Sequence, residues 1–402
     1  MYINREIETT IQEMLRQFKV VLVTGARQVG KTTVLENCLK DTFSYATLEN
    51  PIEAANAEND SLLFFETHSL PLIIDEIQRV PSLFQTTKFI VDQSSDRGQM
   101  VLIGSQTYHL MKGVSESLAG RIGIIEMSGL STRELIGSTR NNGPYIPHAV
   151  GAVERPGSFD LWERIQRGSM PELCASDIPW DRFWTSYTQA YLERDVRDLI
   201  NLKNESKFYD FMVAAAACSG QLFNASDIAN AINVDYKTVQ SWLSILQASG
   251  IVRLLRPFWP NIGKSLTKTP KLYFMDTGLI CHLTRWTTPD QLRNGAVAGH
   301  VFETFVVSEV LKSYMNAGAN LRDVWFYRDT KKREIDLVIQ EGRILHPVEV
   351  KTAATVKADA IKNFKCLESM EGYEVGFGHV ICQTPEPYYV TRNVQAIPVW
   401  TI

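Results

Sequence analysis

Short apolar runs alternate with helical patterns along the first 140 residues of the chain. Runs that are apolar throughout are typical of strands buried on both faces of a parallel sheet. Strands that alternate with helices predict a doubly wound α/β domain, which binds its ligands at the carboxyl ends of the strands. The expected strands are 20–25, 43–48, 70–75, 100–104 and 122–127, and the expected helices between them include 82–95 and 107–118.

A segment rich in Gly, Pro and Asn, from Asn141 to Gly157, separates this region from the next helical patterns, which run from Leu161 to Leu199. Further on, the pattern predicts a helix over 224–232, a turn, a helix from Tyr236 to Ser249 and a strand over 251–255. This order is the layout of a winged helix-turn-helix. The second helix has an apolar face that we expect to be buried, formed by Val239, Trp242, Leu243 and Leu246.

The last region predicts strands over 324–328, 334–339 and 344–351, with a turn at Glu341-Gly342 between the last two. Taken together, these patterns indicate four segments. They are an α/β core over 1–140, a helical lid or linker over 141–204, a winged helix over 205–290 and a second α/β domain over 291–402.

The first strand runs into a complete G-x-x-x-x-G-K-[ST] loop, the Walker A pattern of a P-loop. Backbone N–H groups of such a loop cradle phosphates, its lysine reaches the β- and γ-phosphates, and its hydroxyl residue binds Mg²⁺. We therefore expect ATP as the ligand, Lys31 on its phosphates and Thr32 on Mg²⁺; the alternative is a glycine-containing turn. The expected ATP-binding residues are Gly25, Ala26, Arg27, Gln28, Val29, Gly30, Lys31, Thr32 and Thr33.

The apolar strand Leu70-Pro71-Leu72-Ile73-Ile74 ends in two adjacent carboxylates, Asp75 and Glu76. One carboxylate can hold the Mg²⁺ shell while the other takes a proton from the attacking water. We assign these roles to Asp75 and Glu76 respectively. The alternative is an ordinary strand end with solvated acids.

Composition restricts the remaining options. With a formal net charge of −4 and 21% charged residues, the chain has no general basic character, so any contact with nucleic acid must be local. The six cysteines lie far apart without a C-x-x-C pair, which favours reduced thiols in a cytoplasmic protein. The N-terminal segment is polar, and no apolar run approaches the roughly 18 residues that a membrane span needs. We therefore expect neither a signal peptide nor a membrane segment.

A local basic excess does occur in the predicted winged helix, because the 236–275 segment contains no Asp or Glu. Such an excess favours a surface that binds the phosphates of DNA. The alternative is a winged helix that packs or contacts proteins. The outward residues of the second helix would be Tyr236, Lys237, Gln240 and Ser241, and the basic residues are Lys237, Arg253, Arg256, Lys264, Lys268 and Lys271.

The P-loop, the Asp75-Glu76 strand end, Gly104-Ser105 and Ala119-Gly120-Arg121 together resemble AAA+ ATPases. More narrowly, phrases such as Met170-Pro171-Glu172, Tyr191–Asp195 and Leu272–Gly278 resemble the bacterial and archaeal group with a C-terminal domain of unknown function. The resemblance implies that Ser105 is a sensor of the γ-phosphate. It also implies that Arg121 is an arginine finger facing a neighbour's nucleotide in a dimer or ring.

Two features depart from the typical AAA+ pattern: Gln106 beside the sensor, and Ser128-Gly129-Leu130 where Pro-Leu is commoner. The alternative for Arg121 is an ion pair within its own chain, with Glu126 or Glu116.

The last region carries a second candidate chemistry. Glu349 and Lys351 are two residues apart in a strand and so project from one face, and a hairpin would bring Asp336 beside them. Two carboxylates can hold Mg²⁺ or Mn²⁺ while the lysine positions a water. This D…E-x-K arrangement is similar to the PD-(D/E)XK nuclease superfamily, which implies a restriction-endonuclease-like fold and a further metal ligand from a preceding helix, here Glu303. The alternative is a similar fold whose acids form a polar edge.

The preferred interpretation is Mg²⁺-dependent ATP hydrolysis coupled to DNA binding, with metal-dependent nuclease activity as a further option. The rival is an ATP-driven switch or scaffold whose inactive nuclease-like domain binds proteins.

Overall fold

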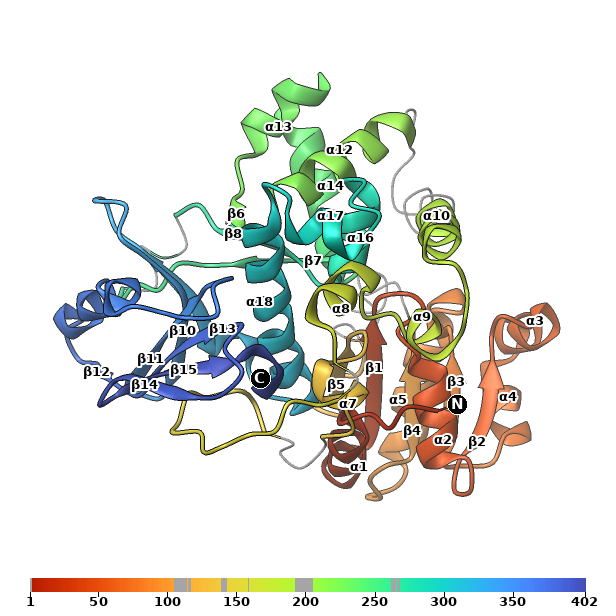
Figure 1. Cartoon of the computed structure of the whole chain (residues 1–402). Helices are drawn as coiled ribbons and strands as arrows, with labels where there is room; N and C mark the ends of the chain where they lie inside the picture. The colour runs from red at the N-terminus through yellow and green to blue at the C-terminus, as the bar shows by residue number, and fades with distance from the viewer. Residues whose placement is uncertain are drawn as a thin grey trace.

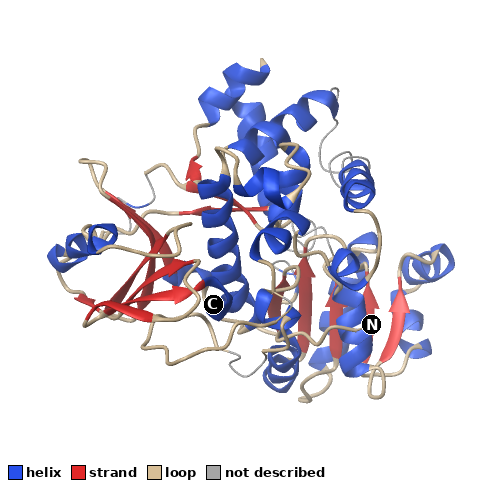
Figure 2. Cartoon of the chain, viewed as in Figure 1, coloured by secondary structure: helices blue, strands red, loops and turns tan. Residues whose placement is uncertain are grey.

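The structure, a computed structural model, describes residues 2–104, 114, 117–138, 143–157, 159–191, 205–261, 265 and 268–402. It has an N-terminal part (2–138), a middle part (143–293) and a C-terminal part (298–402). Two sheets lie on opposite sides of the molecule, and the long helix α18 (Ala298–Asn316) stands between them (Figure 1). Figure 2 shows that residues 205–293 of the middle part, which lie above both sheets in this view, are mainly helical.

The N-terminal part contains a five-stranded parallel sheet in the order β2-β3-β4-β1-β5. All five strands expected from the sequence are present. In this order β4 lies between β3 and β1, so the carboxyl ends of these three strands are neighbours at one edge of the sheet. The strands are β1 (Val20–Gly25), β2 (Ser44–Thr47), β3 (Leu72–Asp75), β4 (Met100–Ile103) and β5 (Ile122–Met127).

Helices cover both faces of this sheet, and the alternation along β1 shows why. Val21 and Val23 pack with helices α1 and α2, whereas Val20 and Leu22 face the opposite core beneath α4 and α5. The expected helix over 107–118 falls mostly outside the described residues. The helices are α1 (Ile7–Gln17), α2 (Lys31–Leu39), α3 (Pro51–Asn59), α4 (Ser61–Thr67), α5 (Ser82–Asp92) and α7 (Thr132–Leu135).

The middle part contains a helical group and a small antiparallel sheet in the order β6-β8-β7. The expected apolar face of α14 is buried. Its helices are α8 (Leu161–Arg167), α9 (Pro171–Ala175), α10 (Trp180–Tyr191), α12 (Glu205–Ala217), α13 (Ala225–Ile232), α14 (Tyr236–Ala248), α16 (Thr277–Leu283) and α17 (Pro289–Arg293). Its strands are β6 (Gln221–Leu222), β7 (Val252–Leu255) and β8 (Lys271–Phe274).

The C-terminal part contains a mixed seven-stranded sheet in the order β14-β15-β13-β11-β10-β9, with β12 beside β11. The expected hairpin is present: β10 and β11 pair antiparallel, Leu337 opposite Val348. The strands are β9 (Val324–Arg328), β10 (Glu334–Glu341), β11 (Ile344–Val350), β12 (Glu374–Val375), β13 (Gly378–Cys382), β14 (Tyr388–Thr391) and β15 (Val394–Pro398).

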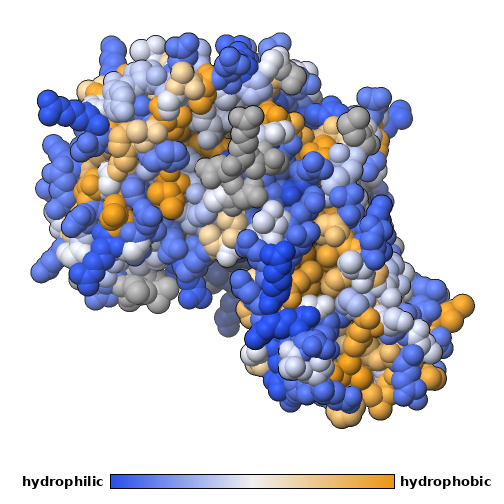
Figure 3. All heavy atoms as spheres, turned by 90° about the horizontal axis from the view of Figure 1, so that it is seen from below, coloured by the Kyte–Doolittle hydropathy of each residue, from blue (hydrophilic) through white to orange (hydrophobic). Residues whose placement is uncertain are grey.

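One continuous hydrophobic core joins the three parts, because it includes residues of β1, α12, α14 and α18. No helix of the described residues is long and apolar enough to span a membrane. The N-terminal part also presents apolar side chains to solvent, and Figure 3 shows apolar surface on the right-hand lobe, the side on which α3, α4 and α5 lie in Figure 1. The exposed large hydrophobic residues of these helices are Ile52, Leu62, Leu63 and Phe89.

Candidate functional site

The loop between β1 and α2 has a backbone that only some residues can adopt. Gly25 has a φ of +143° and lies so close to β5 that a Cβ there would be 2.0 Å from the Met127 carbonyl oxygen. Gly30 has a φ of +88° and precedes the first turn of α2. Both glycines of the motif are therefore required by the backbone, and α2 begins at Lys31, where its N-terminus can face an anion.

The lysine and the hydroxyl of the loop are both held in place. Lys31 Nζ donates to the carbonyl oxygens of Gly25 and Ala26, at 3.0 and 2.8 Å. Thr32 Oγ1 donates to Asp75 Oδ2 at 2.8 Å, although the two residues follow different strands. The parallel sheet thus brings together the two motifs that the sequence placed 43 residues apart.

Asp75 and Thr32 fit a Mg²⁺ ion. Mg²⁺ prefers oxygen ligands and few protein groups, and this site offers a hydroxyl and a carboxylate in direct contact. Tyr45 on β2 also donates to Asp75 Oδ2, at 2.9 Å, and so fixes the orientation of the carboxylate.

Glu76 lies beside Asp75 in the left-handed region of backbone space, with a φ of 55°. Burial and the charge of Asp75 raise the pKa of Glu76, although Lys31 and Arg27 oppose the shift. Gln78 Nε2 donates to Glu76 Oε2 and orients it. A carboxylate with a raised pKa is suited to accept a proton from water.

A cavity of about 450 Å³ opens beside the loop. Gly30, Thr33 and Val34 of the P-loop and α2 line one side of it. The N-terminal residues Tyr2 and Ile3, together with Pro171 to Ser176 around α9, line the rest. The middle part therefore contributes directly to the surroundings of the P-loop.

Carboxylates also converge in the C-terminal part. Asp336 on β10 lies beside β11, and its Oδ2 accepts from the Val350 N–H at 2.9 Å. Lys351 Nζ lies 2.6 Å from Glu349 Oε1. Burial and the neighbouring acids raise the pKa of Asp336 and of Glu349. The expected grouping of Asp336, Glu349 and Lys351 is thus present.

Glu303 differs from the expectation of a third ligand in a shared metal site. Its Oε1 accepts from Lys271 Nζ at 2.8 Å and from the Tyr273 hydroxyl at 2.7 Å. Among the described residues, no three His, Cys, Asp or Glu side chains are placed to share one metal ion. Lys271 itself was expected on a basic surface and is instead buried, because the acids around it compensate its charge.

The remaining residues of the expected basic surface divide into two sets. Tyr236, Lys237 and Ser241 of α14 are exposed, with Gln240 half-buried and bonded to Tyr236. Arg253, by contrast, forms an ion pair with Glu126 of β5, so it is not part of an open surface. Lys268 lies over the Trp259 ring, 4.2 Å from its centroid. Arg256 is exposed, and Lys264 lies outside the described residues.

Arg121 precedes β5 and pairs with Asp92 of α5 through two hydrogen bonds of 2.6 and 2.9 Å. An intrachain pair is therefore present, but its partner is Asp92 and not Glu126, which is bonded to Arg253. Ser105 and Glu116 lie outside the described residues.

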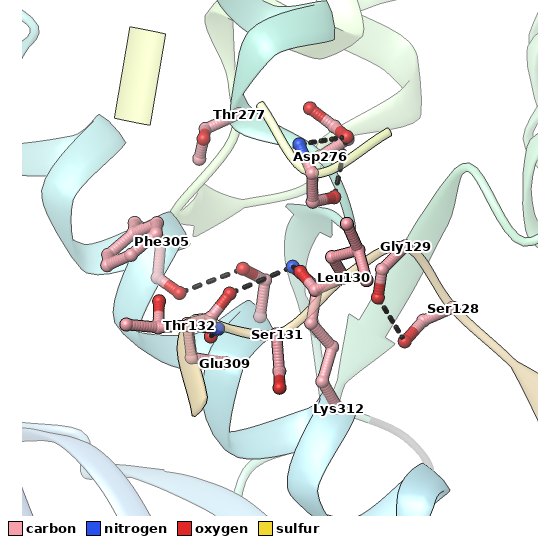
Figure 4. Close-up of polar contacts among 12 residues, drawn as sticks. Ser128, Gly129, Leu130, Ser131, Thr132, Asp276, Thr277, Phe305, Glu309 and Lys312 are labelled. Atoms are coloured by element: carbon pink, nitrogen blue, oxygen red, sulfur yellow. Dashed lines mark hydrogen bonds and ion pairs between the residues drawn. The ribbon is translucent and has the colours of Figure 1, made fainter. Parts of the chain in front are cut away.

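A buried polar junction connects α18 to the segment that follows β5 (Figure 4). Glu309 Oε2 accepts from the Thr132 N–H at 2.5 Å, and Lys312 Nζ donates to the Leu130 carbonyl oxygen at 3.1 Å. Burial would raise the pKa of Glu309, but Lys312 and Arg164 lower it overall. On the other side of the segment, Asp276 Oδ2 accepts from the N–H and the hydroxyl of Ser169.

Comparisons with known proteins assign the N-terminal part. Residues 17–136 match the AAA domain family. Over these residues the chain is similar to AAA-type P-loop ATPases, and the Thr32–Asp75 contact agrees with that similarity. Residues 158–290 and 298–402 match two domains of unknown function, DUF8612 and DUF4143. The match to the AAA family confirms the AAA+ resemblance seen in the sequence and supports an ATPase-like function for the chain.

Two mycobacterial proteins are similar to most of the chain. The chain is 29% identical over 357 residues to the uncharacterized protein Rv2008c of Mycobacterium tuberculosis and to the uncharacterized protein Mb2031c of Mycobacterium bovis. Each match covers 88% of this chain and 74% of the relative.

Among solved structures, the Walker-type ATPase PABY2304 of Pyrococcus abyssi has a TM-score of 0.45 and 15% identity, over 70% of this chain and 96% of that one. The RuvB Holliday junction branch migration motor of Thermotoga maritima has a TM-score of 0.30 and 15% identity, over 62% and 89%.

Several polar residues around the ATPase domain were not singled out from the sequence. Arg5 is buried, donates to the Val29 carbonyl oxygen of the P-loop at 3.0 Å and pairs with Glu134 at 2.8 Å. Tyr45 and Gln78 hold the two carboxylates of the site. The position of Tyr45 in an expected strand offered a signal, whereas the partners of Arg5 lie far away in the sequence. Gln78 lies two residues after its partner Glu76, a local contact that no motif marked.

Proposed function

We propose that this chain is a Mg²⁺-dependent ATPase that couples ATP hydrolysis to DNA binding. The observation that carries the ATPase part is the 2.8 Å contact between Thr32 and Asp75, beside the P-loop lysine. Two motifs that meet in this way provide both a phosphate cradle and a place for the metal ion.

Each residue of the ATPase site has a proposed role. Lys31 leaves the carbonyl oxygens of its own loop and contacts the β- and γ-phosphates, while Thr32 and Asp75 hold Mg²⁺. Mg²⁺ held there would neutralise phosphate charge during transfer. Glu76 accepts the proton of the attacking water, and Gln78 keeps its carboxylate in position. The 450 Å³ cavity between Tyr2, Ile3 and α9 would hold the base and ribose.

DNA binding is proposed for the middle part. The order of α12, β6, α13, α14, β7 and β8 supports a winged helix, with α14 as the recognition helix. Its first turn presents Tyr236 and Lys237 to solvent. The segment between β7 and β8 is not equally available, because Phe258 packs against Trp325 and Tyr373 of the C-terminal part.

ATP hydrolysis measured with and without duplex DNA tests this function. We expect DNA to stimulate the rate and Glu76→Gln to abolish it while ATP still binds. A rate that is insensitive to DNA at any salt concentration, with no DNA retained by the protein, would remove the DNA-binding part and leave the ATPase.

For the C-terminal part we propose a PD-(D/E)XK-like metal site formed by Asp336 and Glu349, with Lys351 beside the attacking water and Mg²⁺ or Mn²⁺ as the ion. The contact of Lys271 with Glu303 favours a second candidate function, an ATP-driven switch with an inactive nuclease-like domain. Cleavage of DNA that is lost in Lys351→Ala, with ATP hydrolysis retained, would support the nuclease; no cleavage with either metal would support the switch.

Self-association is proposed from Arg121 and the apolar surface of the ATPase domain. Arg121 is half-buried in a pair with Asp92, and this pair must open before the guanidinium can reach a neighbour's γ-phosphate. Mixing Arg121→Ala with Glu76→Gln protein should then restore part of the hydrolysis. Specific activity that stays constant down to concentrations where the protein is monomeric would exclude the finger.

A further inference from the structure

A lysine of the middle part is inserted among the carboxylates of the C-terminal part. Lys271 is the first residue of β8, and its side chain is 4% exposed. Its Nζ lies 2.8 Å from Glu303 Oε1 of α18 and 2.6 Å from Glu334 Oε1 of β10. Burial would lower the pKa of Lys271, but the charges of Glu303, Asp336 and Glu334 raise it overall, so the lysine is a cation here.

Tyr273, two residues along the same strand, donates to the same oxygen of Glu303 at 2.7 Å. One carboxylate oxygen therefore accepts two donors from β8. A metal ion that approached this oxygen would have to displace both. These two contacts explain why Glu303 does not join Asp336 and Glu349 in the described arrangement.

The acids next to Lys271 still have an unused acceptor. Glu349 is 8% exposed, and its Oε2 has no hydrogen-bond partner among the described residues. A buried carboxylate oxygen without a partner is unfavourable unless a cation or donor reaches it. Asp336, by contrast, is fixed by the Val350 N–H. The site therefore holds two ammonium groups, Lys271 at Glu303 and Lys351 at Glu349 Oε1, and leaves Glu349 Oε2 as an acceptor open for a further cation.

We propose that Lys271 takes the place of a metal ion at Glu303, and that a divalent cation binds fully to Asp336, Glu349 and Glu303 only when Lys271 leaves. This inference rests on the proposed C-terminal metal site. Lys271 can leave without unfolding that site, because it comes from β8 of the middle part whereas the acids come from α18, β10 and β11. An internal ammonium group would thus control metal loading.

Titration of the full-length protein with Mn²⁺, with free Mn²⁺ followed by electron paramagnetic resonance, tests the proposal without requiring nuclease activity. Lys271→Met should bind Mn²⁺ at least about tenfold more tightly than the wild type, because neighbours of a metal site commonly change affinity by that much. Lys271→Gln, which keeps a donor for Glu303 but not the charge, should show a smaller gain. The gain should disappear when Asp336→Asn is added to Lys271→Met.

Lys268→Met is the matched control, since it removes the same charge three residues earlier, where the ammonium lies over Trp259. It should leave Mn²⁺ affinity unchanged. Folded Lys271→Met and Lys271→Gln proteins that bind Mn²⁺ no more tightly than the wild type would overturn the proposal, as would a gain that survives Asp336→Asn. ATP hydrolysis by the same variants reports separately on the proposed function, because neither substitution touches the P-loop.

Discussion

At the scale of residues, the chemistry that could be predicted is the chemistry carried by short motifs. Lys31, Thr32, Asp75 and Glu76 belong to two local patterns whose roles follow from backbone geometry and ligand preference. Lys271 could not be assigned in the same way. Its sequence neighbourhood is basic, and only the fold shows that its partners are acids on α18 and β10.

Substitutions of Lys31 and of Glu76 should affect different steps of the ATPase reaction. Lys31→Ala removes the phosphate-binding cation and should weaken nucleotide binding, whereas Glu76→Gln removes only the base and should retain ATP while hydrolysis falls. Equilibrium binding of a fluorescent ATP analogue, combined with single-turnover hydrolysis, distinguishes the two effects. Hydrolysis by Glu76→Gln at the wild-type rate would show that another group activates the water.

A buried histidine should make the stability of the C-terminal part sensitive to acid. His379 accepts from the Tyr145 hydroxyl at 2.6 Å and donates to the His148 carbonyl oxygen at 2.8 Å. Burial lowers its pKa to about 4. His379 therefore binds a proton near pH 6.5 in the unfolded chain but only near pH 4 in the folded protein. Because the unfolded state binds more protons between these two pH values, the free energy of unfolding decreases as the pH falls from 6.5 to 4.

At roughly 1.4 kcal/mol per pKa unit, this loss reaches roughly 3 kcal/mol at most. Urea unfolding of wild type and His379→Gln at pH 7 and pH 4.5 measures it. The difference in unfolding free energy between the two pH values should be smaller in the variant. An equal difference in both proteins would assign the acid sensitivity to other groups.

At the scale of elements, alternating apolar runs were sufficient to predict the ATPase sheet, since strands 20–25 and 122–127 are found with those bounds. The helices around the turn at 233–235 were also predicted, because their caps and apolar spacing are local. The packing of the segment after β7 against the C-terminal sheet was not predicted. Pro257 bridges to Phe326, and Phe258 joins the core of the C-terminal sheet, contacts that only the tertiary fold creates.

The contacts between the middle part and the other two parts determine which basic residues are available to bind DNA. Lys237 on the exposed first turn of α14 should contribute to phosphate binding, whereas Arg253 is engaged with Glu126. Lys237→Ala should weaken DNA binding and reduce the salt slope by about 1, because one fewer counterion is released. Fluorescence anisotropy with a labelled duplex across a salt series measures both.

The control is Lys88→Ala, an exposed lysine on α5 of the ATPase domain, which should change neither value. If Lys237→Ala also leaves affinity and slope unaltered, α14 is not the DNA-binding helix, and its exposed turn is better interpreted as a protein contact.

At the scale of the whole molecule, two elements extend from the carboxylate site to the surroundings of the P-loop. α18 carries Glu303 and, nearer its end, Glu309, which accepts from the Thr132 N–H, and Lys312, which donates to the Leu130 carbonyl oxygen (Figure 4). β8 carries Lys271, and Asp276 just beyond it bonds to Ser169. Ala26 and Val29 of the P-loop line the same small cavity as Asp276. The two elements meet again at the Lys271–Glu303 contact, and we expect a relative shift at one end to be transmitted to the other.

This arrangement predicts that metal loading and nucleotide binding affect one another. We expect Lys271→Met to bind Mn²⁺ at the C-terminal site and the double variant Lys271→Met/Asp336→Asn not to bind it there. The two proteins have the same P-loop. At one fixed Mn²⁺ concentration, the affinities of the two proteins for a non-hydrolysable ATP analogue should differ by roughly fivefold or more, the range typical of coupled sites. Isothermal titration calorimetry gives both values.

The coupling should depend on the contacts that carry it. Adding Asp276→Asn weakens the link between β8 and Ser169 without altering either site, so it should reduce the difference between the paired proteins. Thermodynamic linkage also requires the reciprocal effect: the ATP analogue must change the affinity of Lys271→Met for Mn²⁺ by the same factor by which Mn²⁺ changes its affinity for the analogue. Equal analogue affinities in the loaded and unloaded proteins would mean that β8 and α18 join the two sites structurally but transmit no free energy between them.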